Sequence, residues 1–235
     1  MGMQDLFRPG MPHTSHMTGR SVGNRSASAA RHRRGRPGYD VPSLVEASVE
    51  VFTCKGFDGA SMEDLSKHLG ISKSAIYHHV SSKDELLGLA LNRALDALES
   101  VIVENRSLDA GPAERLEHLL RASVHVLIAE RPYVALLLRV RGNTDIERRA
   151  LSRRREFDRY LADLVQAAAD EGIVRPALDP MVSARLLFGL VNSLTDWVRP
   201  GSSPTIVAET LVRIAFHGLF VAEVTNGRVA EDTSW

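Results

Sequence analysis

The sequence predicts an all-α protein, and three observations support this fold class. Apolar residues recur at three- and four-residue spacing in one segment after another between residues 41 and 224. Ser, Gly and Pro residues, which begin or end helices, separate these segments. Strand signals, such as alternating apolar and polar residues around an Asn-Gly turn, do not occur in this region. With 235 residues, 44% of them apolar, the chain can bury a sizeable core in one or two domains.

The first 38 residues differ in composition from the rest of the chain. The whole sequence is neutral, with 29 Lys plus Arg against 29 Asp plus Glu. Residues 1–40, however, hold seven arginines against two aspartates, a balance of +5 that leaves −5 for the remainder. Few periodic apolar residues and many Gly, Ser, Pro and His residues predict that residues 1–38 form a disordered basic arm.

This arm ends in a short arginine motif. Arg34 and Arg36 belong to an Arg-Gly-Arg-Pro sequence that resembles the AT-hook, whose arginines lie in the narrow minor groove of A·T-rich DNA. We therefore expect both arginines to contact DNA. A solvated leader without a DNA contact is the alternative for this segment.

Several classes of protein are excluded by what the sequence lacks. Cys54 is the only cysteine, so no intramolecular disulfide can form and a reducing cytoplasm is the expected compartment. Neither a signal-peptide core nor the roughly 20 apolar residues that cross a bilayer are found. Gly-x-Ser-x-Gly, phosphate-binding Gly-rich and His-Glu-x-x-His motifs are absent, and His118 with His125 has no evident third ligand. We therefore expect no enzyme, no metal site, no cofactor and no membrane association.

Four helices are expected in the N-terminal part, at residues 42–56, 61–70, 72–80 and 82–105. Each of the last three begins at a serine, whose hydroxyl can accept a hydrogen bond from the first turn, and the first two end at a glycine. A short helix, a glycine-containing turn and a second short helix form the arrangement that places the second helix in the major groove of DNA. A small α-hairpin inside a helical protein remains the alternative, since residues 41–88 carry four Lys against seven Asp or Glu.

The residue pattern favours DNA binding, because it resembles the N-terminal domain of TetR-family transcriptional regulators. The resemblance rests on a Ser that opens the second helix, a Gly-Ile-Ser corner, a Tyr-His pair, and a Lys followed by two leucines. The matching residues are Ser61, Gly70, Ile71, Ser72, Tyr77, His78, Lys83, Leu86 and Leu87. The resemblance implies a helix-turn-helix DNA-binding domain at residues 39–100, with the motif itself at about residues 64–83.

Roles at DNA can be assigned to the exposed polar residues of this motif. The predicted DNA-binding residues are Arg34, Arg36, Ser61, Ser72, Lys73, Ser74, Tyr77, His78 and Lys83. Ser61, Tyr77 and Lys83 are expected to hold phosphates, which fixes the register without reading sequence. A contact with a thymine methyl group is the alternative for Tyr77. Lys73 and its polar neighbours are better placed for bases, and Lys73 could address guanine O6 and N7. We expect His79 to pack in a semi-buried position instead.

Helical patterns continue to the C-terminal region. They cover residues 113–130, 133–141, 145–171, 180–198 and 204–224, and Pro132 is expected to end the first of them. The family resemblance implies that residues 101–225 form an effector-binding and dimerisation domain. Residues 226–235 are expected to be a flexible tail.

The last two helices predict a homodimer. The helix at residues 180–198 is apolar almost all round and must be buried, and the helix at residues 204–224 carries its own apolar stripe. The resemblance implies a four-helix interface made from these two helices of each chain. Such a dimer would place two recognition helices about 34 Å apart, as a palindromic operator requires. Burial at the centre of a monomer is the alternative.

The resemblance also implies a small-molecule pocket in the C-terminal bundle. The candidate effector-binding residues are His125, Arg148, Arg155, Asn192 and Trp197. Arg148 and Arg155 lie at helical spacing and would suit a phosphate-bearing ligand, and residues 172–200 resemble the subset of the family that senses acyl-CoA thioesters. The alternatives are a core histidine, a helix–helix hydrogen bond of Asn192, core packing of Trp197, and a solvated arginine face.

Together these features predict a ligand-responsive transcriptional regulator. We expect a repressor that binds a palindromic operator in double-stranded DNA as a dimer and is released by a small-molecule effector, for which an acyl-CoA thioester is one candidate. A ligand-independent architectural DNA-binding protein is the alternative. It would bind DNA broadly, with a steep salt dependence and no response to a metabolite.

Overall fold

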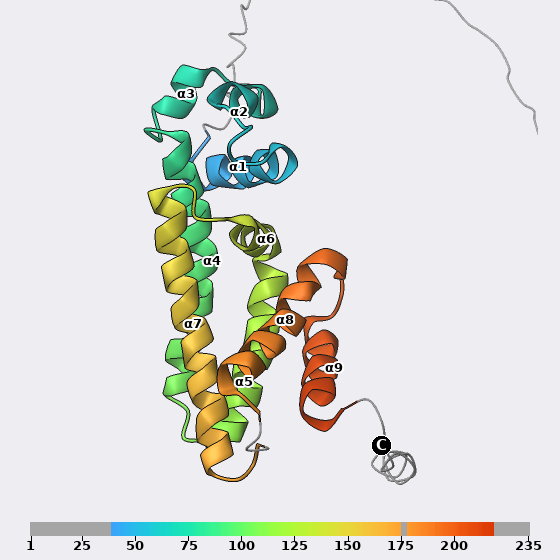
Figure 1. Ribbon diagram of the computed structural model, residues 1–235. Coiled ribbons are helices and arrows are strands. Elements are labelled where there is room, and N and C mark those ends of the chain that lie inside the picture. Colours follow the sequence, from blue (N-terminus) through green and yellow to red (C-terminus); the bar gives the residue numbers. More distant parts are fainter. Residues whose placement is uncertain (1–38, 175–177, 219–235) are drawn as a thin grey trace, which may run out of the picture. The chain divides into compact units, whose positions relative to one another are not determined.

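A computed structural model of the chain describes residues 39–174 and 178–218, and every regular element in these residues is an α-helix (Figure 1). The all-α prediction is therefore confirmed for the described part of the chain. The helices are α1 (Val41–Lys55), α2 (Met62–Leu69), α3 (Lys73–Tyr77), α4 (Lys83–Arg106), α5 (Pro112–Ala129), α6 (Arg131–Arg139), α7 (Asp145–Asp170), α8 (Pro180–Trp197) and α9 (Pro204–His217). In this part of the chain, no helix is long and apolar enough to cross a membrane.

Local capping signals place the boundaries of the N-terminal helices. The side chain of Ser61 accepts a hydrogen bond from the backbone N–H of Asp64, and the Asp64 carboxylate accepts one from the backbone N–H of Ser61. This reciprocal pair is a capping box, and it includes the serine cap that the sequence predicts. Ser72 and Ser82 cap α3 and α4 in the same way, through the backbone N–H groups of the third helical residues. Gly70 ends α2 at φ +65°, a left-handed conformation that glycine adopts without strain.

Two expectations about helix boundaries are wrong. The third helix ends at Tyr77 rather than Val80, because the chain continues as a hydrogen-bonded turn through His78 and His79. Pro132 does not end a helix but lies in the first turn of α6. Proline is tolerated there, since the first-turn N–H groups have no partner within the helix. The fifth helix ends before it, at Ala129.

One long helix, α4, belongs both to the DNA-binding part and to the C-terminal bundle. Its first turns pack against α1, and its buried Leu87 belongs to the same core as Phe52, Leu65 and Ile76 from α1, α2 and α3. Further along, α4 packs against α5, α6 and α7, and it lies beside α7 in Figure 1. The C-terminal helices α8 and α9 pack mainly on α7 and α5, respectively. The helix-turn-helix and the C-terminal bundle thus share one continuous helix.

Polar contacts fasten α6 to its neighbours. The Nη1 group of Arg139 donates to the carbonyl oxygen of Thr53 in α1, at 3.0 Å. On α4, the Nε group of Arg93 donates to Glu130 at 2.7 Å, and its Nη1 group donates to the hydroxyl of Tyr133 at 2.9 Å. Burial raises the pKa of Tyr133. These contacts connect the start of the C-terminal bundle with both α1 and α4.

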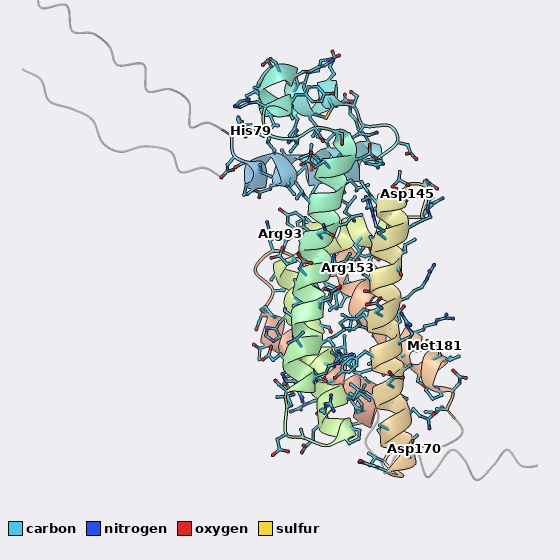
Figure 2. All side chains as sticks on the ribbon, turned by 90° about the vertical axis from the view of Figure 1, so that its left-hand side faces the viewer. His79, Arg93, Asp145, Arg153, Asp170 and Met181 are labelled. Carbon is cyan, nitrogen blue, oxygen red and sulfur yellow. The ribbon has the colours of Figure 1, made fainter. Side chains whose placement is uncertain are left out.

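A second set of polar contacts joins α4 to α7. Arg153 points from α7 towards α4, where its guanidinium donates to Asn92 at 2.8 Å and to Glu99 at 2.7 Å (Figure 2). It also pairs with Asp96. Glu99 and Asp96 raise the pKa of Arg153. This arginine is therefore committed to a contact between helices rather than to a solvated basic face.

Candidate DNA-binding surface and effector region

The short helix α3 presents the polar side chains predicted to meet DNA. Ile76 is fully buried and anchors the helix to the core of the N-terminal part. The surrounding positions are exposed, and they include the predicted contacts Ser72, Lys73, Ser74, Tyr77 and His78. Tyr77 is 51% exposed, and no described residue forms a hydrogen bond with its hydroxyl. The fold therefore exposes these five residues along α3 and at its two caps, as a recognition helix requires.

Lys73 is held by an acidic neighbour on α2. Its ammonium lies 2.9 Å from the carboxylate of Glu63, which also pairs with Lys67 at 3.0 Å. Hydrogen bonds from Lys73 and Lys67 lower the pKa of Glu63. Because all three side chains are exposed, these pairs contribute little to folding. Their effect is to place a negative charge beside the side chain that is the best candidate for a guanine contact.

The substitution Glu63→Gln should raise DNA affinity. It removes a negative charge from the candidate DNA surface and releases Lys73, so we expect a gain of roughly threefold to tenfold at moderate salt. Fluorescence anisotropy with a labelled duplex would measure it. Glu156→Gln on α7 is the matched control, since it makes the same charge change at an exposed site away from α3. An equal gain in both variants, or no gain in Glu63→Gln, would contradict this role of Glu63.

The hydroxyl of Ser61 is engaged within the protein. It donates to the Asp64 carboxylate at 2.6 Å and accepts from the Asp64 backbone N–H at 3.2 Å. Lys55 pairs with the same carboxylate, and the hydrogen bonds from Lys55 and Ser61 hold the pKa of Asp64 well below its usual range. Phosphate binding by Ser61 stays a prediction. Because the Ser61 hydroxyl is engaged, the contact available to a phosphate at this position is the exposed N-terminus of α2.

Lys83 closes the loop between α1 and α2. Its ammonium donates to the carbonyl oxygens of Phe57 at 2.7 Å and Ala60 at 3.0 Å, and it lies 4.2 Å from the centroid of the Phe57 ring. A Lys ammonium has three donors, and these contacts use two of them. The residue pattern predicts only a phosphate contact for Lys83. No local signal indicates the loop contact, because the partners lie 26 and 23 residues away.

One other expectation for this region, the position of His79, can be compared with the structure. His79, which is labelled in Figure 2, is exposed. Its ring meets that of His78 edge to face, with 5.5 Å between centroids. The expectation of a semi-buried His79 is wrong, because the adjacent Val80 takes the buried position. Arg34 and Arg36 lie outside the described residues.

Neither of two cavities in the described residues brings the five candidate effector residues together. An apolar groove of about 260 Å³ lies between α8 and α9, and of the five only Trp197 lines it. A second cavity of about 400 Å³, between α4 and α7, contains none of them. Asn192 on α8 is partly buried. His125 is exposed, so the alternative of a core histidine is wrong.

The two arginines of the set differ in their surroundings. Arg148 is tied to the turn before α7: it pairs with Asp145 and donates to the carbonyl oxygen of Gly142 at 3.0 Å. The same turn is held by the buried carboxylate of Glu147, which accepts hydrogen bonds from three successive backbone N–H groups. Arg155 is exposed. A shared phosphate site for Arg148 and Arg155 stays a prediction.

The outer face of α8 and α9 is exposed and apolar. Its large side chains are between 41% and 68% exposed, and they are Val182, Leu186, Leu190, Trp197, Ile206 and Ile214. The groove between α8 and α9 opens on this face. The expected burial of the helix at residues 180–198 is therefore incomplete within one chain. A contiguous apolar face of this kind indicates a protein–protein interface.

Comparisons with known proteins agree with this geometry. Two family models match: "Bacterial regulatory proteins, tetR family" at residues 44–90 and "Tetracyclin repressor-like, C-terminal domain" at residues 109–219. A TetR-family regulator from Streptomyces coelicolor A3 is 47% identical, with a TM-score of 0.73 over 81% of this chain and 98% of its own. The HTH-type transcriptional repressor KstR2 of Mycobacterium tuberculosis is 25% identical over 77% of this chain and 89% of its own. The fold also matches AibR in complex with isovaleryl coenzyme A and operator DNA, at 23% identity and a TM-score of 0.64 over 77% of this chain and 99% of its own.

Proposed function

The chain belongs to the TetR family of transcriptional regulators. From this premise we propose that it is a dimeric repressor that binds a palindromic operator and dissociates from it when a small-molecule effector binds. Regulators of this family bind operator DNA and small effectors and are not enzymes. The observation that carries the proposal is the exposed polar face of α3, which stands on the buried Ile76. We place the protein in the cytoplasm, where its DNA would be.

The proposed DNA contacts divide into two groups. Tyr77 and the start of α2 at Ser61 are assigned to phosphates, and Lys83 is assigned to holding the loop that precedes Ser61. Lys73, Ser74 and His78, with Ser72 at the start of α3, are assigned to base edges in the major groove. Arg34 and Arg36 are proposed to extend this contact into the minor groove.

The dimer in this proposal forms through the apolar face of α8 and α9. A second copy of the same face covers it with matching apolar side chains, which is the usual geometry of a two-fold interface. The two recognition helices then read two half-sites on one side of the duplex. This arrangement explains why so many large apolar side chains are exposed on one chain.

The proposed effector is an acyl-CoA thioester. Support comes from the arginine-rich α7, whose side chains Arg148, Arg155 and Arg159 are exposed, since guanidinium groups bind phosphates well. The solved structure of AibR with isovaleryl coenzyme A shows that this fold can accommodate such a ligand. His125, Asn192 and Trp197 stay candidates for the contact with the acyl part.

Operator selection tests the proposed function. The full chain would be used to enrich a random duplex library, and the enriched DNA would be mapped by footprinting. We expect a short palindrome whose protection is lost on adding a CoA thioester and retained with the matching free acid. Broad binding with a steep salt dependence, no palindrome and no response to any thioester would instead favour a ligand-independent architectural protein.

A further inference from the structure

A cluster of polar side chains lies where α4, α5 and α7 meet, away from the helix-turn-helix. Asn105 on α4 is fully buried. Its side-chain N–H₂ group donates to the carbonyl oxygen of Arg115 at 2.7 Å and lies 3.1 Å from Nδ1 of His118. Its oxygen accepts a hydrogen bond from the buried hydroxyl of Tyr160 at 2.7 Å. Side chains from three helices thus form one connected network.

The network carries positive charge that no carboxylate neutralises. The Nη2 group of Arg115 donates to the Tyr160 hydroxyl at 2.8 Å, and the guanidinium of Arg106 lies 4.9 Å from the centroid of the Tyr160 ring. Within residues 39–174 and 178–218, neither arginine forms a salt bridge, and neither does His118. Most arginines that are partly buried in proteins are paired with an acid. Arg115 is partly buried, so the absence of an acid paired with it among the described residues is unusual, whereas Arg106 is exposed.

Two further features of this place favour an anion. The Nε atom of Arg115 is buried and has no hydrogen-bond partner among the described residues, which costs free energy unless a ligand or a water supplies an acceptor. In addition, α5 begins at Gly111 without a side-chain cap, so that the N–H groups of its first turn, just before Arg115, also lack side-chain acceptors. Glu114 in that turn is exposed and forms no salt bridge with Arg115. Each feature would be satisfied by an oxygen anion.

We propose that Arg115, Arg106 and Tyr160 form a binding site for an oxyanion, either a carboxylate or a phosphate group of the effector. The anion would accept hydrogen bonds from Nε and Nη2 of Arg115 and from the Tyr160 hydroxyl, with Arg106 supplying a second charge from the exposed side. This is separate from the arginines of α7 to which the acyl-CoA phosphates were assigned. The inference rests on the proposed ligand response and names the chemistry by which the C-terminal bundle recognises its ligand.

Occupation of this site would act on α4. When the Tyr160 hydroxyl donates to the anion, it no longer donates to Asn105, and the buried Asn105 oxygen loses its partner. Asn105 lies near the end of the same helix that begins at Lys83, beside the DNA-binding part. The hydrogen bonding of α4, which extends to the helix-turn-helix, therefore differs between the anion-free and the anion-bound protein. A ligand can shift a conformational equilibrium only through such a difference between states.

Thermal unfolding of the full chain tests the site without DNA. The midpoint would be measured at constant ionic strength while chloride is replaced by sodium phosphate, by sodium hexanoate, or by acetyl-CoA. We expect at least one oxyanion to raise the midpoint saturably, by about 5 to 10 °C at a hundredfold excess over its dissociation constant. A rise with hexanoate alone assigns the site to a carboxylate, and a rise with phosphate or acetyl-CoA assigns it to a phosphate group.

Three substitutions locate the effect. Arg115→Gln and Arg106→Gln should each abolish the rise in the unfolding midpoint or weaken the apparent anion affinity at least tenfold. If Arg115→Gln does not fold, the result for Arg106→Gln tests the site. Arg149→Gln is the matched control, because it makes the same charge change at an exposed position on α7 to which no ligand contact is assigned. The site is ruled out if no anion raises the wild-type midpoint, if both cluster variants keep the full rise, or if Arg149→Gln loses it equally. None of these results depends on operator binding, so the proposed function can fail or succeed separately.

Discussion

The substitution Leu186→Glu yields a folded monomer and lowers operator affinity by about a hundredfold or more. Leu186 is 68% exposed on the outer face of α8 in a single chain, so a glutamate there leaves the fold of that chain intact. In the proposed dimer the same residue is buried against its copy, where two unpaired carboxylates are strongly unfavourable. A monomer has only one recognition helix, so it loses the increase in operator affinity that comes from linking two DNA-binding domains.

Sedimentation velocity and operator titration would measure the two parts of this prediction. Val103→Glu is a closely matched control, since Val103 is also 68% exposed but lies on α4, outside the α8–α9 face. We expect Val103→Glu to stay dimeric and to bind the operator normally. A dimeric Leu186→Glu, or a monomeric Val103→Glu, would show that the interface lies elsewhere.

The parts of this fold that the sequence predicts well are those set by neighbouring residues. Ser61 and Asp64 are three positions apart, and together they fix the start of α2. Gly70 fixes its end, because its positive φ excludes further helix. The recognition helix follows from the same local logic, with Ser72 as its cap. Pro132 shows the limit of such signals, since proline marks the beginning of a helix as readily as the end of one.

Contacts between residues distant in sequence could not be predicted in this way. Arg153 reaches Asn92, 61 positions earlier, and Tyr160 reaches Asn105, 55 positions earlier. The sequence shows an arginine-rich helix, but which arginines face acids on another helix depends on the rotation of α7 against α4. The exposed apolar face of α8 and α9, in contrast, could be predicted from the sequence. Its apolar pattern exceeds what one chain buries, and that excess was visible in the sequence.

Lys83→Met should lower both stability and operator affinity. The substitution removes an ammonium that donates to the carbonyl oxygens of Phe57 and Ala60, and hydrogen bonds from a charged donor are worth about 1.5 to 3 kcal/mol. Chemical denaturation should therefore show a loss of about 2 kcal/mol. The freed loop precedes Ser61, so the start of α2 loses its fixed position and the operator affinity falls about tenfold.

The salt dependence separates this positioning role from a direct phosphate contact by Lys83. A lost phosphate contact reduces the slope of log Kobs against log salt concentration by about 0.9, whereas a misplaced α2 lowers affinity and leaves the slope nearly unchanged. We expect the unchanged slope for Lys83→Met. Lys83→Arg provides a second criterion, because arginine can still meet a phosphate but its planar guanidinium does not fit between two carbonyl oxygens in place of an ammonium. If Lys83→Arg restored wild-type affinity and Lys83→Met lost a full unit of slope, the lysine would act on DNA directly and its loop contacts would be incidental.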